Sequence, residues 1–373
     1  METNAEVISP TEAIKPTLSS QDIVVGTDVV RVSCAEFFPH LTEQEQEHFD
    51  PTRAVIHLPG WPWKVDQSVI WPLPRSLAEQ SKVRTLSIDT RTNKIGPDSL
   101  QIESAGIAAF LEEQSVREVT LVGHSEGAIR AVNLAVVLQE QYPDIKINGV
   151  VLANPMGMNN RSLAEIAKGF LLDIFKISGQ ERRKMGVDKP KGLEMQFAQS
   201  LLKDIAFAGP RYLHMLKNQL NNLININPYL EKIKAPVVVM ATDRDLVSDL
   251  RKYLPPSEIE NRQPPPQTEE ELIDEIGKKW DEMSEERKTE YEAIYGSREN
   301  YINSYQDAYK SRKEMVSLTR VRQRYLEANL LPEAENVVFL VGTKHADHGG
   351  IIDFRPETAA HIISRIFGRL RRQ

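Results

Sequence analysis

The chain contains very little cysteine, no long apolar run and no excess of basic residues, and each shortage excludes a class of protein. Cys34 is the single cysteine among 373 residues, which excludes an intrachain disulfide and any zinc site built on two or more thiolates. No stretch approaches the roughly 18 consecutive apolar residues of a membrane-spanning helix, and the N-terminus lacks the basic opening and apolar core of a signal peptide. We therefore expect a soluble protein of a reducing, cytoplasmic compartment.

The charge balance disfavours a nucleic-acid partner. The chain has 46 Lys and Arg against 53 Asp and Glu, a formal net charge of −7. A polyanionic strand is repelled by such a protein unless a local basic patch overrides the total. The other proportions, 40% hydrophobic and 27% charged residues, are those of an ordinary globular protein.

Short β-branched runs alternate with helical patterns from residue 22 onward, which predicts an α/β fold with a mostly parallel sheet flanked by helices. The expected strands are 28–37, 53–58, 83–89, 117–123, 147–154, 235–241 and 336–342. Helical apolar spacing covers 98–114 and 126–142, and a closing helix is expected at 356–370. Several strands are almost wholly apolar, as in a parallel sheet that is covered on both faces.

Two segments interrupt this alternation. Residues 156–232 contain helical patterns and no convincing strand, so we expect a helical cap there. Residues 251–334 form a second, charged helical insertion that is well beyond ordinary loop length. The α/β core is expected to comprise 22–155, 233–250 and 335–373, after a flexible lead-in over 1–21.

The motif that indicates chemistry is Gly-His-Ser-Glu-Gly at 123–127, between an apolar strand and a helix of small residues. A strand-to-helix turn this sharp strains the backbone of the serine and needs glycines where side chains would collide. Ser125 would thus be presented as a nucleophile at the C-terminal edge of the sheet. The alternative is a structural turn with a solvated serine.

In this context the motif resembles the nucleophile elbow of the α/β-hydrolase family, over about 22–250 and 335–373. The family takes one oxyanion-hole N–H from the residue after the nucleophile and another from the loop after an early strand. The resemblance assigns these donors to Glu126 and Trp61. The loop departs from the commoner pattern by two residues before Gly60, so Gly60 and Trp61 could instead be a turn followed by a core aromatic residue.

The order of the family's triad, serine, then acid, then histidine, places the two partners after the last two strands. Asp245 fits the acid turn, with Asp243 as the alternative two residues earlier. His348 fits the base, because a glycine-rich loop and a Pro-Glu helix start follow it, and His345 is the alternative. The acid and base are 103 residues apart (348 − 245), which the second insertion explains.

The resemblance implies a serine hydrolase of the carboxylic ester hydrolase, lipase or thioesterase type. It would cleave a small ester or ester-like acyl substrate through an acyl-enzyme, without a cofactor or metal. Carboxylate-nucleophile chemistry is disfavoured because the elbow residue is Ser125. Tryptophans at 61, 63 and 71 favour an apolar acyl pocket or, equally, a packed aromatic core. A hydrolase fold that has lost activity and serves as a ligand-binding or scaffold protein is the alternative function.

A metal hydrolase is the next alternative, because His345, Asp347 and His348 resemble half of a metallo-β-lactamase signature. Thr343 stands where that signature has its first histidine, and only 25 residues (373 − 348) remain for further ligands. A zinc site needs at least three protein ligands, so this interpretation is disfavoured.

The insertion resembles a DNA-bending module locally, since residues 276–288 are similar to the middle of a high-mobility-group box. Residues 268–314 contain eight Lys and Arg against fourteen Asp and Glu, a local charge of −6 (8 − 14) that opposes phosphate contact. We expect an additional cap or a protein-contact surface instead, with a protein partner or a second copy of the chain as its partner.

Overall fold

A computed structural model divides the chain into two compact units, one comprising Met1–Asp249 and Leu330–Gln373, the other Leu250–Asn329. The structure describes residues 14–60, 63–92, 98–156, 227–242, 269–285, 287–289, 292, 297–303, 337–342, 359–361 and 363–364. Within these ranges, none of the helices has both the length and the apolarity needed to cross a membrane.

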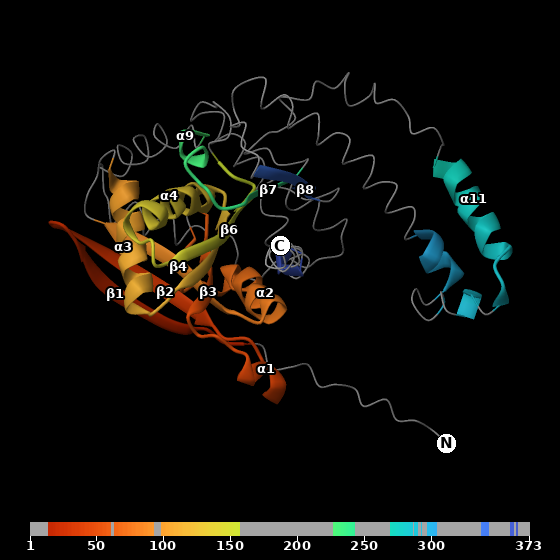
Figure 1. The fold of residues 1–373 in the computed structure, drawn as a ribbon, viewed down its shortest axis with the longest axis horizontal. Coiled ribbons are helices and arrows are strands. Elements are labelled where there is room, and N and C mark those ends of the chain that lie inside the picture. Colours follow the sequence, from red (N-terminus) through yellow and green to blue (C-terminus); the bar gives the residue numbers. More distant parts are fainter. Residues whose placement is uncertain are drawn as a thin grey trace. The chain divides into compact units, whose positions relative to one another are not determined.

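One eight-stranded sheet forms the centre of the larger unit, with the strand order β1-β2-β4-β3-β5-β6-β7-β8 (Figure 1). Its strands are β1 (Thr17–Val25), β2 (Asp28–Phe37), β3 (Arg53–Leu58), β4 (Arg84–Thr92), β5 (Glu118–His124), β6 (Lys146–Ala153), β7 (Val237–Thr242) and β8 (Val337–Gly342). β2 is antiparallel to β1 and β4, and all other pairs are parallel. The carboxyl ends of β3 to β8 therefore share one edge of the sheet.

Different helices cover the two faces of the sheet. The described helices of this unit are α1 (Glu43–Glu47), α2 (Pro72–Ser81), α3 (Ser99–Glu113), α4 (Glu126–Gln141) and α9 (Asn227–Leu230), with a 3₁₀ turn at Ser68–Ile70. Val30 of β2 lies against Gly106 of α3, whereas Ala35 and Phe37 cluster with Ala78 of α2. Side chains of opposite parity on a strand point to opposite faces, so α2 and α3 lie on opposite faces. α4 packs beside α3.

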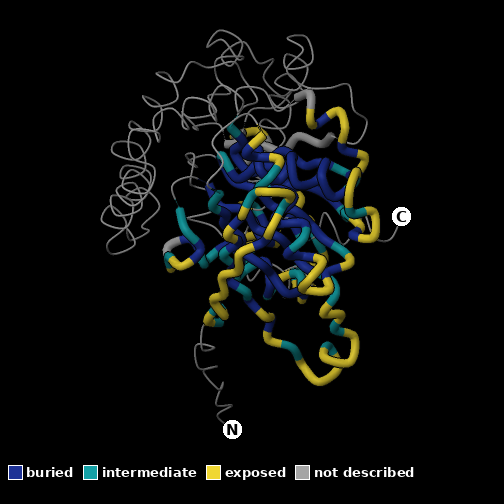
Figure 2. Tube along the Cα trace, turned by 90° about the vertical axis from the view of Figure 1, so that its left-hand side faces the viewer, coloured by how far each residue is buried: buried dark blue, intermediate teal, exposed yellow. Residues whose placement is uncertain are grey.

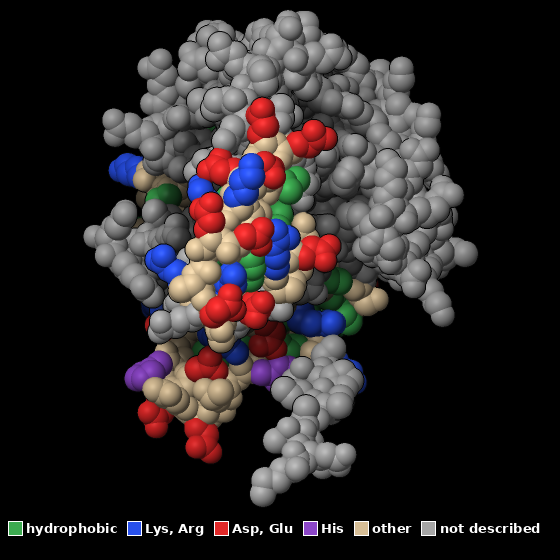
Figure 3. Space-filling view, turned by 90° about the vertical axis from the view of Figure 1, so that its right-hand side faces the viewer, with side chains coloured by type: hydrophobic (Ala, Val, Ile, Leu, Met, Phe, Trp, Pro, Cys, Tyr) green, Lys and Arg blue, Asp and Glu red, His purple; other side chains and the backbone are tan. Residues whose placement is uncertain are grey.

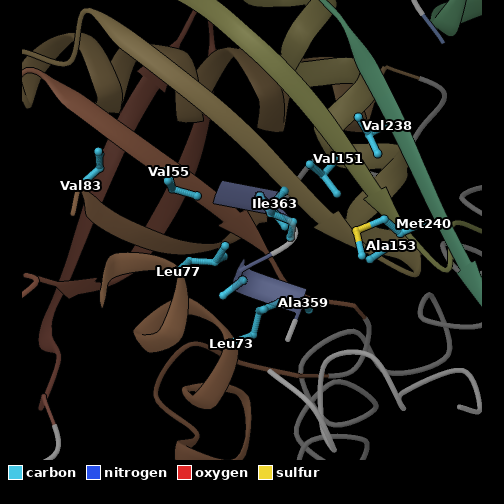
Figure 4. Close-up of a cluster of buried hydrophobic side chains, with 12 residues drawn as sticks. Val55, Leu73, Leu77, Val83, Val151, Ala153, Val238, Met240, Ala359 and Ile363 are labelled. Atoms are coloured by element: carbon cyan, nitrogen blue, oxygen red, sulfur yellow. The ribbon is translucent and has the colours of Figure 1, made fainter. Parts of the chain in front are cut away.

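The face that α2 covers holds a continuous apolar layer. Val122, Val151 and Val238 are directly paired across β5, β6 and β7, and all three are buried. Leu77 of α2 and Ile363 of the C-terminal helical segment belong to the same buried cluster, in which Leu77 lies near Val55 and Ile363 (Figure 4). Burying one such side chain is worth about 1.5–3 kcal/mol, so this layer fixes the central strands relative to one another. Figure 2 shows the same concentration of buried residues at the centre of the unit.

The sequence predicted most of these elements. The α/β class, the mostly parallel sheet, the seven expected strands and the helices at 98–114 and 126–142 are confirmed, with ends that differ by at most three residues. Residues 157–226 of the expected cap lie outside the described residues. The expected closing helix is described only at 359–361 and 363–364, which are helical.

β1 begins inside the segment 1–21, which the sequence predicted to be a flexible lead-in. The strand starts at Thr17 and pairs without interruption, from Thr17 opposite Glu36 to Val25 opposite Asp28. Ile23 is its only buried residue. An edge strand has a single neighbour and exposes most of its side chains, so it does not show the apolar pattern by which buried strands are recognised.

The helix α2, which begins with Pro72 and contains Pro74, is not predicted by the sequence pattern. Proline is tolerated in the first turn of a helix, where its missing N–H would have no intrahelical partner. The two prolines therefore lie near the start of α2, and do not interrupt it.

The smaller unit contains the charged helix α11 (Glu269–Asp281). Ile276 and Trp280 of α11 pack with Tyr301 in a small apolar cluster, in which the Trp280 and Tyr301 ring centroids are 5.0 Å apart. The outer side of α11 carries i,i+4 ion pairs such as Asp274 with Lys278. Acidic and basic side chains are accordingly interspersed over its surface (Figure 3), which gives no basic patch in the described part of the unit.

Candidate active site

The carboxyl ends of the central strands lie side by side in the larger unit. β5 ends at His124, which is paired with Ala153 at the end of β6, and Ala153 is paired with Met240 of β7. β7 and β8 end together at the paired residues Thr242 and Gly342. The segments that follow these strands therefore leave the same edge of the sheet, which is where ligands bind in open α/β sheets.

Ser125 forms the turn between β5 and α4. Its backbone has φ 54° and ψ −118°, a conformation that costs a residue with a side chain about 1–3 kcal/mol. The N–H of Ser125 donates to the carbonyl of Ala153 at 3.0 Å, and its carbonyl accepts from the N–H of Met156 at 3.2 Å. Hydrogen bonds to the end of β6 and the residues after it thus hold the strained turn, and Ser125 is 3% exposed.

The glycines on either side of Ser125 permit close backbone packing. A Cβ atom on Gly127 would lie 2.1 Å from the carbonyl oxygen of Leu58 in β3. A Cβ atom on Gly123 would lie 2.3 Å from the carbonyl oxygen of Gly127. Real Cβ atoms essentially never approach other atoms closer than 3.0 Å. Any side chain at either position would therefore push α4 away from the sheet and change the turn.

The loop after β3 also reaches Ser125. A Cβ atom on Gly60 would lie 2.9 Å from the Cβ of Ser125. The carbonyl of Gly60 accepts a hydrogen bond from the N–H of Trp63 at 3.1 Å, so the chain turns directly after this approach. The segment predicted to supply an oxyanion donor is thus in contact with the predicted nucleophile. Trp61 itself lies outside the described residues, whereas Glu126 is the first residue of α4.

The four candidates for the acid and the base follow strands whose ends are described. Asp243 and Asp245 come after β7, His345 and His348 come after β8, and all four lie outside the described residues. Because β7 and β8 end at paired residues, the segments that follow them begin side by side. Which carboxylate and which histidine act together stays a prediction. Among the described residues no group of three or more His, Cys, Asp or Glu is arranged to hold a metal ion.

Buried charges gather around Arg130, one turn after Glu126 along α4. The side chain of Arg130 is 7% exposed. Its Nη2 donates to Thr90 Oγ1 at 2.6 Å, its Nη1 lies 3.7 Å from Asp89 Oδ1, and its Nε lies 4.0 Å from Glu103 Oε2. Thr90 Oγ1 in turn donates to Glu103 Oε2 at 3.0 Å. The end of β4, α3 and the start of α4 are therefore joined through one guanidinium group.

The environment of Glu103 favours its protonated form. Burial, together with repulsion from Glu126 and Asp89, raises the pKa of Glu103 to about 7, against the attraction of Arg130 and the hydrogen bond from Thr90. Lys64, in the loop after β3, places its Nζ 3.8 Å from Asp89 Oδ2 and adds a second cation. With Glu103 protonated, two carboxylates face two cations, and the cluster is close to neutral.

This cluster was not predicted from the sequence, although the sequence contains a signal for it. Arg130 lies in the buried stretch of α4 from Gly127 to Leu138, whose other side chains are small, apolar or amide. A buried guanidinium group requires a carboxylate partner, since an unpaired buried charge is very costly. A single arginine in such a helix therefore predicts acidic residues on the elements that pack against it.

His57 and Ser87 form a second buried polar pair, on β3 and β4. His57 Nδ1 and Ser87 Oγ are 2.9 Å apart, and these residues are opposite each other in the parallel pair. Burial lowers the pKa of His57 to about 3, so its imidazole is neutral at any pH near 7. A histidine that does not become charged in this range cannot serve as the general base, and we assign it to the strand interface.

A cavity of about 120 Å³ opens at the opposite edge of the sheet. Arg53 and Glu118, at the starts of β3 and β5, line it together with Ile363. Since Ser125 follows the end of β5, the length of that strand separates this cavity from the candidate nucleophile.

Known proteins resemble the chain in sequence profile and in fold. Residues 55–273 match the profile described as "Alpha/beta hydrolase family". No protein of the curated collection matches the chain.

Two solved structures illustrate the similarity of fold. A membrane phospholipase A described as a bacterial virulence factor is 14% identical, with a TM-score of 0.51 over 95% of this chain and 87% of that one. A serine hydrolase from the polyaromatic-hydrocarbon-degrading bacterium Cycloclasticus zankles is 12% identical, with a TM-score of 0.51 over 94% of this chain and 98% of that one. At such low identity these likenesses show the α/β-hydrolase fold alone.

Proposed function

Because this chain belongs to the alpha/beta hydrolase family and is a hydrolase, we propose that it uses a serine nucleophile to cleave ester-like acyl bonds of small-molecule substrates. The observation that supports this most strongly is the strained turn at Ser125, held by backbone hydrogen bonds and contacted by Gly60. A strained residue at the carboxyl edge of a sheet is typical of catalytic sites.

In the proposed reaction Ser125 Oγ attacks the substrate carbonyl carbon while His348 takes the hydroxyl proton. Asp245 accepts a hydrogen bond from the other imidazole nitrogen and stabilises the imidazolium. The carbonyl π electrons move onto oxygen, and their return breaks the bond to the leaving oxygen, which takes the proton from His348. Water then attacks the acyl-enzyme in the same manner, which releases the carboxylic acid and restores the serine.

The backbone amides of Trp61 and Glu126 would stabilise the negative oxygen. The Glu126 amide belongs to the first turn of α4, where N–H groups have no intrahelical partner and the helix dipole favours an anion. The contact of Gly60 with Ser125 supports the second donor, because it brings the loop after β3 against the nucleophile. Losing one such donor costs about 3–4 kcal/mol of transition-state stabilisation in well-characterised hydrolases.

Labelling by an active-site fluorophosphonate, together with p-nitrophenyl ester hydrolysis, tests the proposal. The wild type should be labelled and active, and Ser125→Ala should lose both properties while it remains folded. Ser104→Ala is the matched control, because Ser104 is also buried but lies in α3. Full labelling of Ser125→Ala would refute the assignment of the nucleophile. A folded wild type that is neither labelled nor active would favour the inactive binding protein.

A chain-length series of p-nitrophenyl esters, from acetate to long acyl chains, would define the substrate class. Trp71 does not need an acyl-pocket role, since its ring packs against Phe37 at 6.4 Å and its Nε1 donates to the Val65 carbonyl at 2.8 Å. It belongs to the core on the face of α2. Acyl specificity therefore depends on other residues around Ser125.

A further inference from the structure

The two segments proposed to hold the oxyanion donors are both followed closely by a cation, which is partly buried in the first segment and buried in the second. Lys64 comes three residues after Trp61, and Arg130 comes four residues after Glu126. In the first segment the N–H of Trp63 donates to the Gly60 carbonyl at 3.1 Å, and the N–H of Lys64 donates to the Gln67 side chain at 2.9 Å. The second segment is the start of α4, where Arg130 lies one turn after Glu126.

Asp89 lies between these two cations. Its Oδ2 is 3.8 Å from Lys64 Nζ and its Oδ1 is 3.7 Å from Arg130 Nη1, so each carboxylate oxygen faces a different segment. The Asp89 side chain is 9% exposed, and the weak screening at such a site strengthens both attractions. One carboxylate thus attracts the loop after β3 and the helix α4 towards the same point.

Glu103 competes with Asp89 for the guanidinium group. Arg130 Nε is buried, has no hydrogen-bond partner within the described ranges, and lies 4.0 Å from Glu103 Oε2. The charged groups around Glu103 are Arg130 and Glu126 from α4 and Asp89 from β4, with Lys64 beyond Asp89. Ionisation of Glu103 adds a third carboxylate to two cations and draws Arg130 away from Asp89.

We propose that Asp89 is a positioning residue, which holds the two oxyanion-donor segments in register through Lys64 and Arg130, and that ionised Glu103 weakens this connection. The inference rests on the proposed function for its catalytic consequence. The structural part, that Asp89 joins the two segments, is independent of what the protein hydrolyses.

Asp89→Asn tests the connection, because it removes the charge and keeps the shape of the side chain. We expect kcat on a p-nitrophenyl ester to fall about tenfold or more with KM within about twofold, since the donors act mainly in the transition state. Hydrogen exchange should become faster both at residues 63–67 and in the first turn of α4. Glu36→Gln is the matched control, because Glu36 accepts from the buried guanidinium of Arg84 at 3.3 Å on β2 and β4. It should leave kcat and both exchange rates unchanged.

Glu103→Gln tests the competition, because an amide keeps the hydrogen bond from Thr90 and cannot ionise. Both proteins share the same general base, so its titration affects both kcat values equally. Dividing the kcat of Glu103→Gln by the kcat of the wild type removes that common pH dependence. We expect a ratio near one at pH 6, where wild-type Glu103 is protonated, and at least about threefold at pH 8.5. A ratio that is constant over this range would overturn the role of Glu103.

The exchange measurement separates failure of this inference from failure of the proposed function. An active wild type with an Asp89→Asn variant that keeps its kcat and its exchange rates would overturn the inference and leave the function intact. An inactive wild type in which Asp89→Asn still speeds exchange in both segments would refute the function and support the connection. If Asp89→Asn does not fold, Lys64→Gln removes one half of the connection, and unchanged exchange at residues 63–67 and in α4 would overturn the inference.

Discussion

Gly60→Ala should reduce activity while it leaves the fold intact. A Cβ atom at this position would lie 2.9 Å from Ser125 Cβ and 3.0 Å from the His124 carbonyl oxygen. Ordinary contacts begin at 3.4 Å, so the loop or the elbow must move by at least about 0.5 Å (3.4 − 2.9). The elbow is held by hydrogen bonds to the end of β6 and to Met156, so we expect the loop to move.

The displacement sets the expected loss of rate. Misplacement of a catalytic group by about 1 Å costs up to about a hundredfold in rate, and complete loss of an oxyanion donor costs about a hundredfold to a thousandfold. A shift of about half that distance should therefore lower kcat/KM by roughly ten- to a hundredfold. Overpacking at one site costs about 1–3 kcal/mol of stability, which a domain of ordinary stability survives.

Gly106→Ala is the control that separates a clash at the site from a clash elsewhere. Its Cβ would lie 2.8 Å from Val30 Cβ, an approach as close as that of Gly60, but between α3 and β2. We expect it to lower the midpoint of thermal unfolding to a similar extent, with kcat/KM per folded molecule unchanged. Both quantities are measured by circular dichroism and by ester hydrolysis. Equal losses of kcat/KM in the two variants would refute the argument, because the effect would then be a general consequence of overpacking.

Four further predictions concern the triad, the elbow, the cysteine and the buried acid. His348→Ala should lose as much activity as Ser125→Ala, and His345→Ala should keep most of it. The reverse ranking would identify His345 as the base. Gly127→Ala should unfold the larger unit at lower denaturant than the wild type, because its Cβ would lie 2.1 Å from a strand carbonyl. Cys34 is buried and burial raises its pKa to about 12, so iodoacetamide at pH 8 should label it only in denaturant. Because folding raises the pKa of Glu103 from 4.5 to about 7, its contribution to stability is present below about pH 4.5 and is lost as the pH rises through about 7. Glu103→Gln should remove this pH dependence from the unfolding free energy.

The sequence predicted the central sheet because its strands are buried on both faces. Runs such as 119–122 and 150–152 contain only apolar residues and Thr120, and parallel pairing between helices is the environment that such runs require. β1 could not be found in this way, since its stability comes from backbone pairing with β2 and a single buried residue, Ile23. Backbone hydrogen bonds to a neighbouring strand leave no apolar pattern in the residues of the strand that makes them.

The candidate nucleophile was predictable for a similar local reason. The strain at Ser125 and the glycines at 123 and 127 are both consequences of a strand entering a helix with a minimal turn, and all of these residues are contiguous. The cluster around Arg130 joins residues from three elements that are far apart in the chain. Its partners could be inferred as carboxylates, but only the strand order and the packing of α3 beside α4 identify Asp89 and Glu103.

In the larger unit, the residues that hold the strained turn at Ser125 differ from the residues that are proposed to affect the rate of the reaction. The strain at Ser125 persists because β5, β6 and β7 cannot slide past one another, and the row of Val122, Val151 and Val238 on the α2 face supplies that rigidity. Arg130 acts on the first turns of α4 through charges that cost free energy to bury and contribute little to net stability. Substitutions in the apolar row should therefore lower stability and activity together. Substitutions in the charge cluster should alter kcat through the two donor segments, and those that leave the Arg130 guanidinium without a carboxylate should also lower stability.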